Sequence, residues 1–442
     1  MQSTDDATQS WIQNVIAGLT VSFVAISLGA AFGILSTRGA FVGILSAGLI
    51  ALITSLFGGT RIQCSGPTAP MTAVTVAVIV DAKERMAQSA LGGASVDHFV
   101  NIVIYLAGAL LVVMALLRLG RFITLVPKVV ISGFMNGIAV LIWLDQVKKL
   151  FGLGGMEAMG GVLALNIAVA SVTLVLLFVV PGLLKKHVPQ LAHYLPGTLM
   201  GILIMTPLVY MLGLDVELVN LDTQLGSWSE LSAMVQAQWP TTWSGDVLTL
   251  AFPFALQLAF LCYLDTLLTS LVVDKLVQAK FKSQECTAQN KELLAQGVAN
   301  ASVALIGGIP GAQATIRSVL ILNEGATMRI AGVMTGVFVF VEMILFQDLI
   351  STIPTAVFAG ILFKVGYDVF DWEPVFAALS KDTANKPSPM NWFFIVGTTG
   401  ITLLMDLNTA VIGFCILFYV GKHFFSIEDM PDGVEKAMSD EN

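Results

Sequence analysis

The chain alternates long apolar runs with short polar connections along almost its whole length. A membrane-spanning helix needs about 20 largely apolar residues, and runs of about that length, several of them short or broken, occur about fourteen times. The segments predicted to span are 12–34, 40–57, 68–81, 99–117, 125–145, 160–184, 196–213, 247–273, 293–306, 315–323, 329–346, 353–366, 390–406 and 408–426. This pattern predicts an all-α polytopic membrane protein.

Two of the apolar stretches are interrupted by helix-breaking residues. Segment 65–72 reads Ser-Gly-Pro-Thr-Ala-Pro-Met-Thr, and segment 308–317 reads Gly-Ile-Pro-Gly-Ala-Gln-Ala-Thr-Ile-Arg. In hydrocarbon, irregular backbone is tolerated only where it packs in protein or lines a wet cavity. Corresponding interruptions in two halves of a chain are the best sequence pointer to the binding site of a transporter. We therefore predict a substrate site between the two breaks.

The two halves of the chain follow the same plan. Each opens with a long helix, at 12–34 and 247–273, and each then reaches its break after a similar separation. About seven spans per half would place the second half upside down relative to the first, as in an inverted-topology repeat. Because many multispan proteins contain Gly and Pro breaks, coincidence is the alternative interpretation.

Composition and charge agree with the membrane class. Hydrophobic residues make up 56% of the 442 residues and charged residues only 12%, whereas soluble domains carry about 25% charged residues. Asp5 and Asp6 precede the first apolar run, so this run is predicted to be a retained span and not a cleaved signal peptide. The four cysteines show no metal or disulfide spacing, and the net charge of −8 argues against a nucleic-acid partner.

The basic residues predict the orientation. Short cytoplasmic loops carry an excess of Lys and Arg, and with the N-terminus inside, the inner loops carry most of them. These residues are Arg61, Arg118, Arg121, Lys128, Lys185, Lys186, Lys275, Lys280, Lys282, Lys291, Lys381 and Lys386. Segment 214–246 is acidic and contains no Lys or Arg, which fits an external loop. The prediction is a multi-pass cell-membrane protein with both termini in the cytoplasm.

An ionisable residue lies inside an apolar span at Asp265. A charge at that depth costs about 2.5–3.5 kcal/mol on insertion scales, which suggests a function. Thr269 follows one helical turn later on the same face, so a carboxylate and a hydroxyl point together. Such hard oxygen ligands suit Na⁺ or a transferable proton, and a neutral Asp265 held by hydrogen bonds for packing is the alternative.

A second charge, Arg317, lies just after the second break. An unpaired guanidinium in hydrocarbon is costly, so we expect Arg317 to face the cavity or the Asp265 region. The half-helix N-termini near Thr68 and Thr315 would offer free N–H groups and positive dipole ends to an anion, and Arg317 would strengthen that site. An Arg317 that snorkels to the membrane surface is the alternative.

Taken together and in order, a series of short motifs resembles the SulP family of anion transporters over nearly the whole chain. These motifs are Ala17–Val21, Phe57–Thr60, Ser65–Thr68, Ser132–Gly137, Leu264–Ser270, Gln296–Asn300, Gly307–Gly311 and Ala359–Asp368. The family includes sulfate and chloride/bicarbonate exchangers and sodium-dependent bicarbonate transporters.

The resemblance implies two inverted repeats of about seven spans each, divided into a core domain that moves and a gate domain. The core domain would comprise 1–123 and 246–350, and the gate domain 124–245 and 351–426. Residues 427–442 would form an acidic cytoplasmic tail in place of the STAS domain that family members usually carry. The resemblance also implies a homodimer.

The resemblance implies the ligand contacts as well. Substrate would contact Phe32, Ser65, Thr68, Ala69, Gln313, Ala314 and Thr315, in addition to Arg317. Na⁺ would be bound by Asp265, Thr269, Ala314 and Thr315. Ser27 replaces a Pro and Leu28 a Gln that other members carry, which leaves the identity of the anion open.

The leading hypothesis is secondary active transport of bicarbonate or sulfate with Na⁺, by an elevator-like movement and without any other cofactor. Within the same transport class, alternatives are proton-coupled symport or exchange of a dicarboxylate or other anion, and a nucleobase permease of the same fold. A channel would need a continuous polar lining. An intramembrane enzyme would need a motif such as His-Glu-x-x-His or a second carboxylate beside Asp265, and the sequence contains neither.

Overall fold

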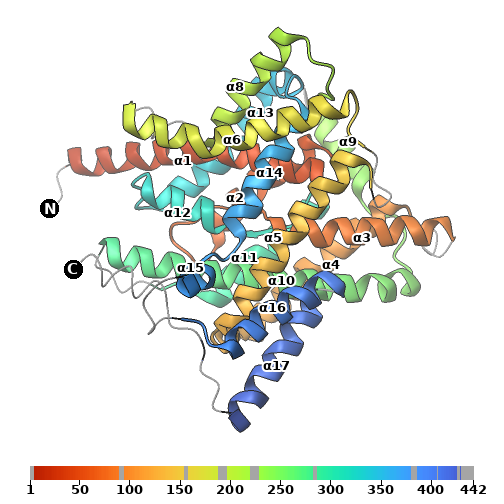
Figure 1. The fold of residues 1–442 in the computed structure, drawn as a ribbon, viewed down its shortest axis with the longest axis vertical. Helices are drawn as coiled ribbons and strands as arrows, with labels where there is room; N and C mark the ends of the chain where they lie inside the picture. Colours follow the sequence, from red (N-terminus) through yellow and green to blue (C-terminus); the bar gives the residue numbers. More distant parts are fainter. Residues whose placement is uncertain are drawn as a thin grey trace. The chain divides into compact units, whose positions relative to one another are not determined.

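The computed structural model is almost entirely helical, and it describes residues 4–88, 94–153, 158–187, 197–219, 228–281, 286–379, 386–405, 407–425 and 429 (Figure 1). Every predicted span forms a helix. The helices that correspond to the predicted spans are α1 (Thr4–Leu35), α2 (Ala40–Phe57), α3 (Ala69–Ala87), α4 (Val96–Leu116), α5 (Lys128–Phe151), α6 (Leu163–His187), α8 (Gly197–Leu212), α10 (Gly245–Phe281), α11 (Gln289–Ala304), α12 (Thr315–Asn323), α13 (Ile330–Ile350), α14 (Thr355–Val369), α16 (Pro389–Leu404) and α17 (Leu407–Phe425).

Further short elements lie between these helices. They are the 3₁₀ helix η1 (Leu119–Leu125), the helices α9 (Trp228–Gln238) and α15 (Glu373–Leu379), and the strands β1 (Ser65–Pro67) and β2 (Gly311–Gln313). Within the described ranges, six helices are long and apolar enough to cross a membrane by length and composition: α1, α2, α4, α5, α6 and α10. The predicted all-α membrane class is therefore confirmed.

Some helices extend beyond the apolar run that predicted them. The third predicted span ends at 81, but α3 continues to Ala87. Arg85 Nε lies 2.5 Å from Asp81 Oδ2, one turn earlier on the same helix face. Such pairs stabilise an exposed helical turn, so α3 continues where hydrophobicity alone predicts an end.

The chain forms two compact units, one of residues 1–121 and 147–362 and the other of residues 122–146 and 363–442. In the first unit, α1 packs against α2 and α13, while α4 packs against α10 and α11. The α1–α2 contact depends on small residues, because a Cβ atom at Gly43 would lie 2.0 Å from the carbonyl oxygen of Gly29. The core and gate boundaries inferred from the family resemblance stay a prediction.

The second unit contains the start of α5 together with α16 and α17. Gly133 lets α5 approach α16, since a Cβ atom there would lie 2.6 Å from the side chain of Thr398. The ring of Phe394 packs edge-on against Phe418 of α17, with centroids 5.4 Å apart. Of the predicted acidic tail, only Asp429 is among the described residues, and it accepts hydrogen bonds from the backbone N–H groups of Lys128 and Val129.

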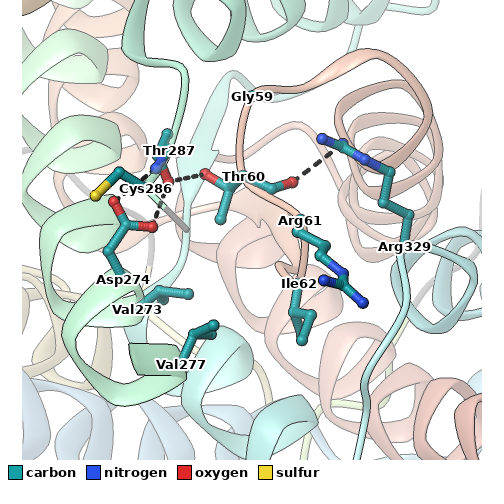
Figure 2. Close-up of a pocket in the computed structure, with 10 residues that line it drawn as sticks. All are labelled: Gly59, Thr60, Arg61, Ile62, Val273, Asp274, Val277, Cys286, Thr287 and Arg329. Carbon is teal, nitrogen blue, oxygen red and sulfur yellow. Dashed lines mark hydrogen bonds between the residues drawn. The ribbon is translucent and has the colours of Figure 1, made fainter. Parts of the chain in front are cut away.

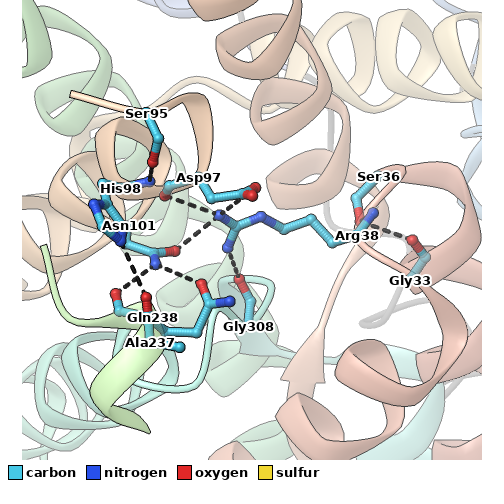
Figure 3. Close-up of polar contacts among 10 residues, drawn as sticks. All are labelled: Gly33, Ser36, Arg38, Ser95, Asp97, His98, Asn101, Ala237, Gln238 and Gly308. Atoms are coloured by element: carbon cyan, nitrogen blue, oxygen red, sulfur yellow. Dashed lines mark hydrogen bonds and ion pairs between the residues drawn. The ribbon is translucent and has the colours of Figure 1, made fainter. Parts of the chain in front are cut away.

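A polar cluster in the first unit joins segments that are far apart in the sequence (Figure 3). Arg38, between α1 and α2, donates to the carbonyl oxygen of Gly308 at 2.9 Å and to Asn101 Oδ1 of α4 at 2.8 Å. Asn101 in turn donates to the backbone and side-chain oxygens of Gln238 at the end of α9. Burial lowers the pKa of Arg38 to about 10, an effect that the nearby carboxylate of Asp97 partly offsets. This cluster holds the turn that leads into β2.

Candidate functional site

The two helix breaks meet in one small sheet. Strands β1 and β2 pair antiparallel, with Ser65 opposite Gln313, Gly66 opposite Ala312 and Pro67 opposite Gly311. Both strands are fully buried. The pairing satisfies backbone groups that the helix breaks would otherwise leave unpaired in hydrocarbon, and it brings the two interrupted segments side by side.

A helix begins immediately after each strand. Thr68 precedes α3 and Ala314 precedes α12, and neither residue caps its helix with a side-chain hydrogen bond. The first N–H groups of a helix have no partner within the helix, and its N-terminus carries a partial positive charge. The two helix starts therefore place uncapped N–H groups at the ends of the sheet, an arrangement that suits an anion.

Alternation along the strands separates the side chains onto two faces of the sheet. On one face, Gly66 makes room for Arg317 of α12, since a Cβ atom at Gly66 would lie 2.5 Å from Arg317 Nη1. Arg317 is only 1% exposed, and its Nη2 donates to the carbonyl oxygen of Pro67 at 2.8 Å. Its Nε and Nη1 are buried and have no hydrogen-bond partner. The guanidinium thus lies inside the protein with two donors available for a ligand.

The carboxylate of Asp265, on α10, belongs to the same group of residues. It interacts electrostatically with Arg317 and with the Thr68 side chain. Asp265 Oδ2 and Thr68 Oγ1 are both buried without a hydrogen-bond partner. One turn further along α10, Thr269 Oγ1 lies 2.7 Å from Thr315 Oγ1. The structure therefore brings side chains of α10 together with both breaks.

The remaining predicted site residues lie around this group. Ala69 is buried at the start of α3, whereas Ala314 is half-buried and Thr315 is exposed at the start of α12. Phe32 is buried in α1, a helix that packs against β1, α3 and α12. Contact of these residues with a substrate stays a prediction.

The opposite face of the sheet has a different environment. The Ser65 hydroxyl donates to Gln63 Oε1 at 3.0 Å and accepts from Gln296 Nε2 at 2.8 Å. Gln313 Oε1 accepts from the Thr60 hydroxyl at 3.3 Å, while its Nε2 is buried without a partner. The Ser65 hydroxyl thus uses its proton within the protein, and any contact of Ser65 with a substrate would rely on its backbone.

The main residue that sequence reasoning missed is Glu292. It lies in the first turn of α11, is 0% exposed, and accepts hydrogen bonds from Thr60 N, Gln63 Nε2 and Gln296 Nε2. A usable signal existed, because Glu292, Gln296 and Asn300 recur every four residues and so form a polar stripe along one helix face. Asn300 Nδ2 donates to the carbonyl oxygen of Gly311, and Asn300 Oδ1 accepts from its N–H.

A cavity of ≈ 350 Å³ lies beside this polar face (Figure 2). Its lining includes Thr60, Asp274, Thr287 and Arg329. Thr287 donates to both carboxylate oxygens of Asp274 at 2.8 Å, and Arg329 Nη1 donates to the carbonyl oxygen of Thr60 at 3.1 Å. None of the predicted substrate or Na⁺ ligands is among the residues that line this cavity.

The model of the sulfate permease family matches residues 12–386, which is most of the chain. The chain belongs to the sulfate permease family. The bicarbonate transporter BicA of Picosynechococcus sp. is 31% identical over 413 residues, which cover 90% of this chain and 68% of that protein. The putative sulfate transporter YvdB of Bacillus subtilis is 30% identical over 427 residues, which cover 93% of this chain and 73% of that protein.

Solved structures agree with this assignment. The transmembrane domain of a cyanobacterial BicA matches with a TM-score of 0.75 and 28% identity, covering 90% of this chain and 97% of that domain. The structure of SLC26A9 matches with a TM-score of 0.70 and 16% identity over 93% of this chain and 65% of that chain, a likeness of fold alone. These findings confirm the predicted family, the inverted-repeat membrane fold and the class of anion transporter, and they decide against an enzyme.

Proposed function

We propose that this sulfate permease family member imports a small inorganic anion, bicarbonate or sulfate, together with Na⁺. The observation that carries the proposal is the set of buried groups without partners on Thr68, Asp265 and Arg317. Buried polar groups are nearly always hydrogen-bonded in native proteins. Several such groups at one place, beside two uncapped helix starts, indicate that ligands complete the site.

The anion would lie between the starts of α3 and α12. Arg317 Nε and Nη1 would donate charge-assisted hydrogen bonds, which are stronger than neutral ones. The uncapped N–H groups after Thr68 and Ala314 would donate to the same anion. The names of the relatives support bicarbonate or sulfate as the cargo, because BicA is a bicarbonate transporter and YvdB a putative sulfate transporter.

The coupling cation would lie beside α10. Asp265 Oδ2 has no partner, and Thr269 and Thr315 bring their hydroxyl oxygens within 2.7 Å of each other. With the carbonyl oxygen of Ala314, these residues form a set of hard oxygen donors, the kind of ligands that hard cations prefer. A bare carboxylate at 265 would repel the anion, so Na⁺ binding should raise the affinity for the anion by linkage.

The proposed transport cycle moves the loaded site as a body. All the proposed ligands belong to the first compact unit, so anion and cation would travel together. The elevator-like movement of core against gate, the homodimer, and the cell-membrane location with both termini in the cytoplasm belong to the same proposal. They are supported by the family resemblance and, for orientation, by the distribution of Lys and Arg.

The test is uptake of labelled bicarbonate and sulfate into proteoliposomes, with and without a Na⁺ gradient, at fixed pH and clamped potential. Saturable uptake of one anion that rises with Na⁺ supports the proposal and names the anion. Uptake that ignores Na⁺ but follows a pH gradient would reassign Asp265 to proton coupling. Current that does not saturate, or no uptake of either anion, would contradict the proposal.

A further inference from the structure

We infer that Glu292 is a positioning residue for the anion site: its carboxylate organises a polar layer behind the β1–β2 sheet, and this layer sets the affinity for the anion. The layer consists of Glu292 with Thr60, Gln63, Ser65, Gln296 and Gln313. The inference rests on the proposed function. Glu292 itself lies behind the sheet and acts through the residues it holds.

The carboxylate of Glu292 determines how its neighbours are oriented. A carboxylate only accepts hydrogen bonds, so every group that faces it must donate. Glu292 Oε2 accepts from Thr60 N and Gln63 Nε2, both at 2.9 Å, and Oε1 accepts from Gln296 Nε2 at 3.1 Å. The side-chain amides of Gln63 and Gln296 are thereby assigned, with their nitrogens toward Glu292.

These oriented groups hold one end of the sheet. With its nitrogen on Glu292, Gln63 presents Oε1 to the Ser65 hydroxyl, and Gln296 Nε2 also donates to that hydroxyl. On the paired strand, Thr60 donates to Gln313 Oε1. Ser65 and Gln313 are partners in the register, and Gln313 directly precedes the start of α12. The carboxylate thus fixes the strand end from which Arg317 is presented.

The same helix holds the other end of the sheet. Asn300, two turns after Glu292 on α11, bonds the N–H and the carbonyl oxygen of Gly311 at 2.8 and 2.9 Å. Gly311 lies opposite Pro67, whose carbonyl oxygen accepts the bond from Arg317. The stripe of Glu292, Gln296 and Asn300 therefore spans the full length of the sheet.

The segment that carries Thr60 lies between groups of opposite charge. Its N–H faces Glu292, and its carbonyl oxygen accepts from Arg329 Nη1 (Figure 2). Gly58 permits this close approach, because a Cβ atom there would lie 2.6 Å from Glu292 Oε2. Thr60 is consequently held on both sides of its backbone, so its hydroxyl reaches Gln313 from a fixed position.

Glu292→Gln is the informative change, because it keeps the shape of the side chain and replaces one acceptor oxygen with a donor. At least one of the three N–H groups then faces another N–H, and the layer must rearrange. We expect the KM for the anion in Na⁺-driven uptake to rise about tenfold, and Vmax to stay within about twofold. A defect that merely reduced the amount of folded protein would lower Vmax and leave KM unchanged.

Glu342→Gln is the matched control. Glu342 is another buried carboxylate, on α13, and it accepts a hydrogen bond from the Ser22 hydroxyl at 2.7 Å, away from the sheet. Its KM for the anion should equal that of the wild type. An equal rise in KM for both variants would overturn the inference, because it would show a general effect of removing buried carboxylates.

Thr60→Val keeps the inference testable if Glu292→Gln does not fold. It removes the hydroxyl that bonds Gln313 and keeps the N–H that bonds Glu292. We expect KM to rise about threefold, and the double variant to show less than the product of the two effects, since both act through one network. Wild-type uptake with an unchanged KM in Thr60→Val or Glu292→Gln would overturn the inference alone. A wild-type protein that takes up neither anion overturns the proposed function, and the inference with it.

Discussion

The two helix breaks share a backbone plan but differ in their side chains. Each consists of a three-residue strand followed by a helix whose N-cap makes no side-chain hydrogen bond. The first break ends in Thr68, whose hydroxyl is available, and its helix carries no charge near the start. The second ends in Ala314 and carries Arg317 in its first turn. Repetition thus supplies the geometry of the site, while divergence between the repeats supplies its charge.

The helices that follow the breaks differ in length for identifiable reasons. Helix α3 has 19 residues and continues through the Asp81–Arg85 pair. Helix α12 has nine residues and ends before Gly325, whose φ of 85° lies in the left-handed region that favours glycine. The charged half of the site is therefore built on the shorter helix, which depends more on the contacts of Arg317 with β1.

Removal of the charge that distinguishes the second break should have the largest effect. Arg317→Gln should lower kcat/KM for anion uptake about 100-fold, since hydrogen bonds to charged groups contribute about 1.5–3 kcal/mol and 1.36 kcal/mol is tenfold. Initial rates of uptake at several anion concentrations would measure this loss. Arg61→Gln, an exposed position at the cavity of Figure 2, should stay within about twofold. Wild-type kinetics in Arg317→Gln would exclude the guanidinium from the site.

The next change tests the cation next to the second break. In Asp265→Asn the oxygen set loses its charge while the side chain keeps its size, so Na⁺ should no longer raise the affinity for the anion. Coupled sites change affinity by about 5- to 150-fold, and this factor should fall to about one. The measurement is the KM for the anion at zero and saturating Na⁺. Retained Na⁺-dependent uptake in this variant would sink the assignment.

A pair of glycine substitutions compares the strands themselves. In Gly66→Ala the new methyl group would meet the end of the flexible Arg317 side chain at 2.5 Å, whereas in Gly311→Ala it would meet the backbone of Gly66 at 2.2 Å. Gly66→Ala should raise the KM for the anion about tenfold with an unchanged melting temperature. Gly311→Ala should lower the melting temperature by about 5 °C, because backbone cannot move aside. Equal melting temperatures would show that the sheet tolerates both methyl groups.

The smallest effect concerns the two N-caps. Thr68→Ala removes a hydroxyl without a partner, so uptake should weaken about 2- to 10-fold, the range for one neutral hydrogen bond. Ala314→Ser adds a hydroxyl at the corresponding place in the second break and makes the two breaks more alike. We expect Ala314→Ser to recover part of the loss when combined with Thr68→Ala. No recovery would mean that the two helix starts contribute unequally to the anion.

The sequence by itself determined the spans, the positions of the two breaks, and the charged residues Asp265 and Arg317. Length and hydrophobicity suffice for the spans, because hydrocarbon admits few other structures. Gly and Pro mark the breaks for the same reason. A charge in an apolar run is costly enough to identify a site without any knowledge of its partners.

The tertiary structure alone decided which side chains face which side of the site. Sequence spacing cannot reveal the register that pairs Ser65 with Gln313, because the strands lie in opposite halves of the chain. That register turns the Ser65 hydroxyl toward Gln296 and away from Arg317. Glu292 escaped prediction for the same physical reason: its donors, Thr60 and Gln63, come from a distant segment that reaches it only through helix packing.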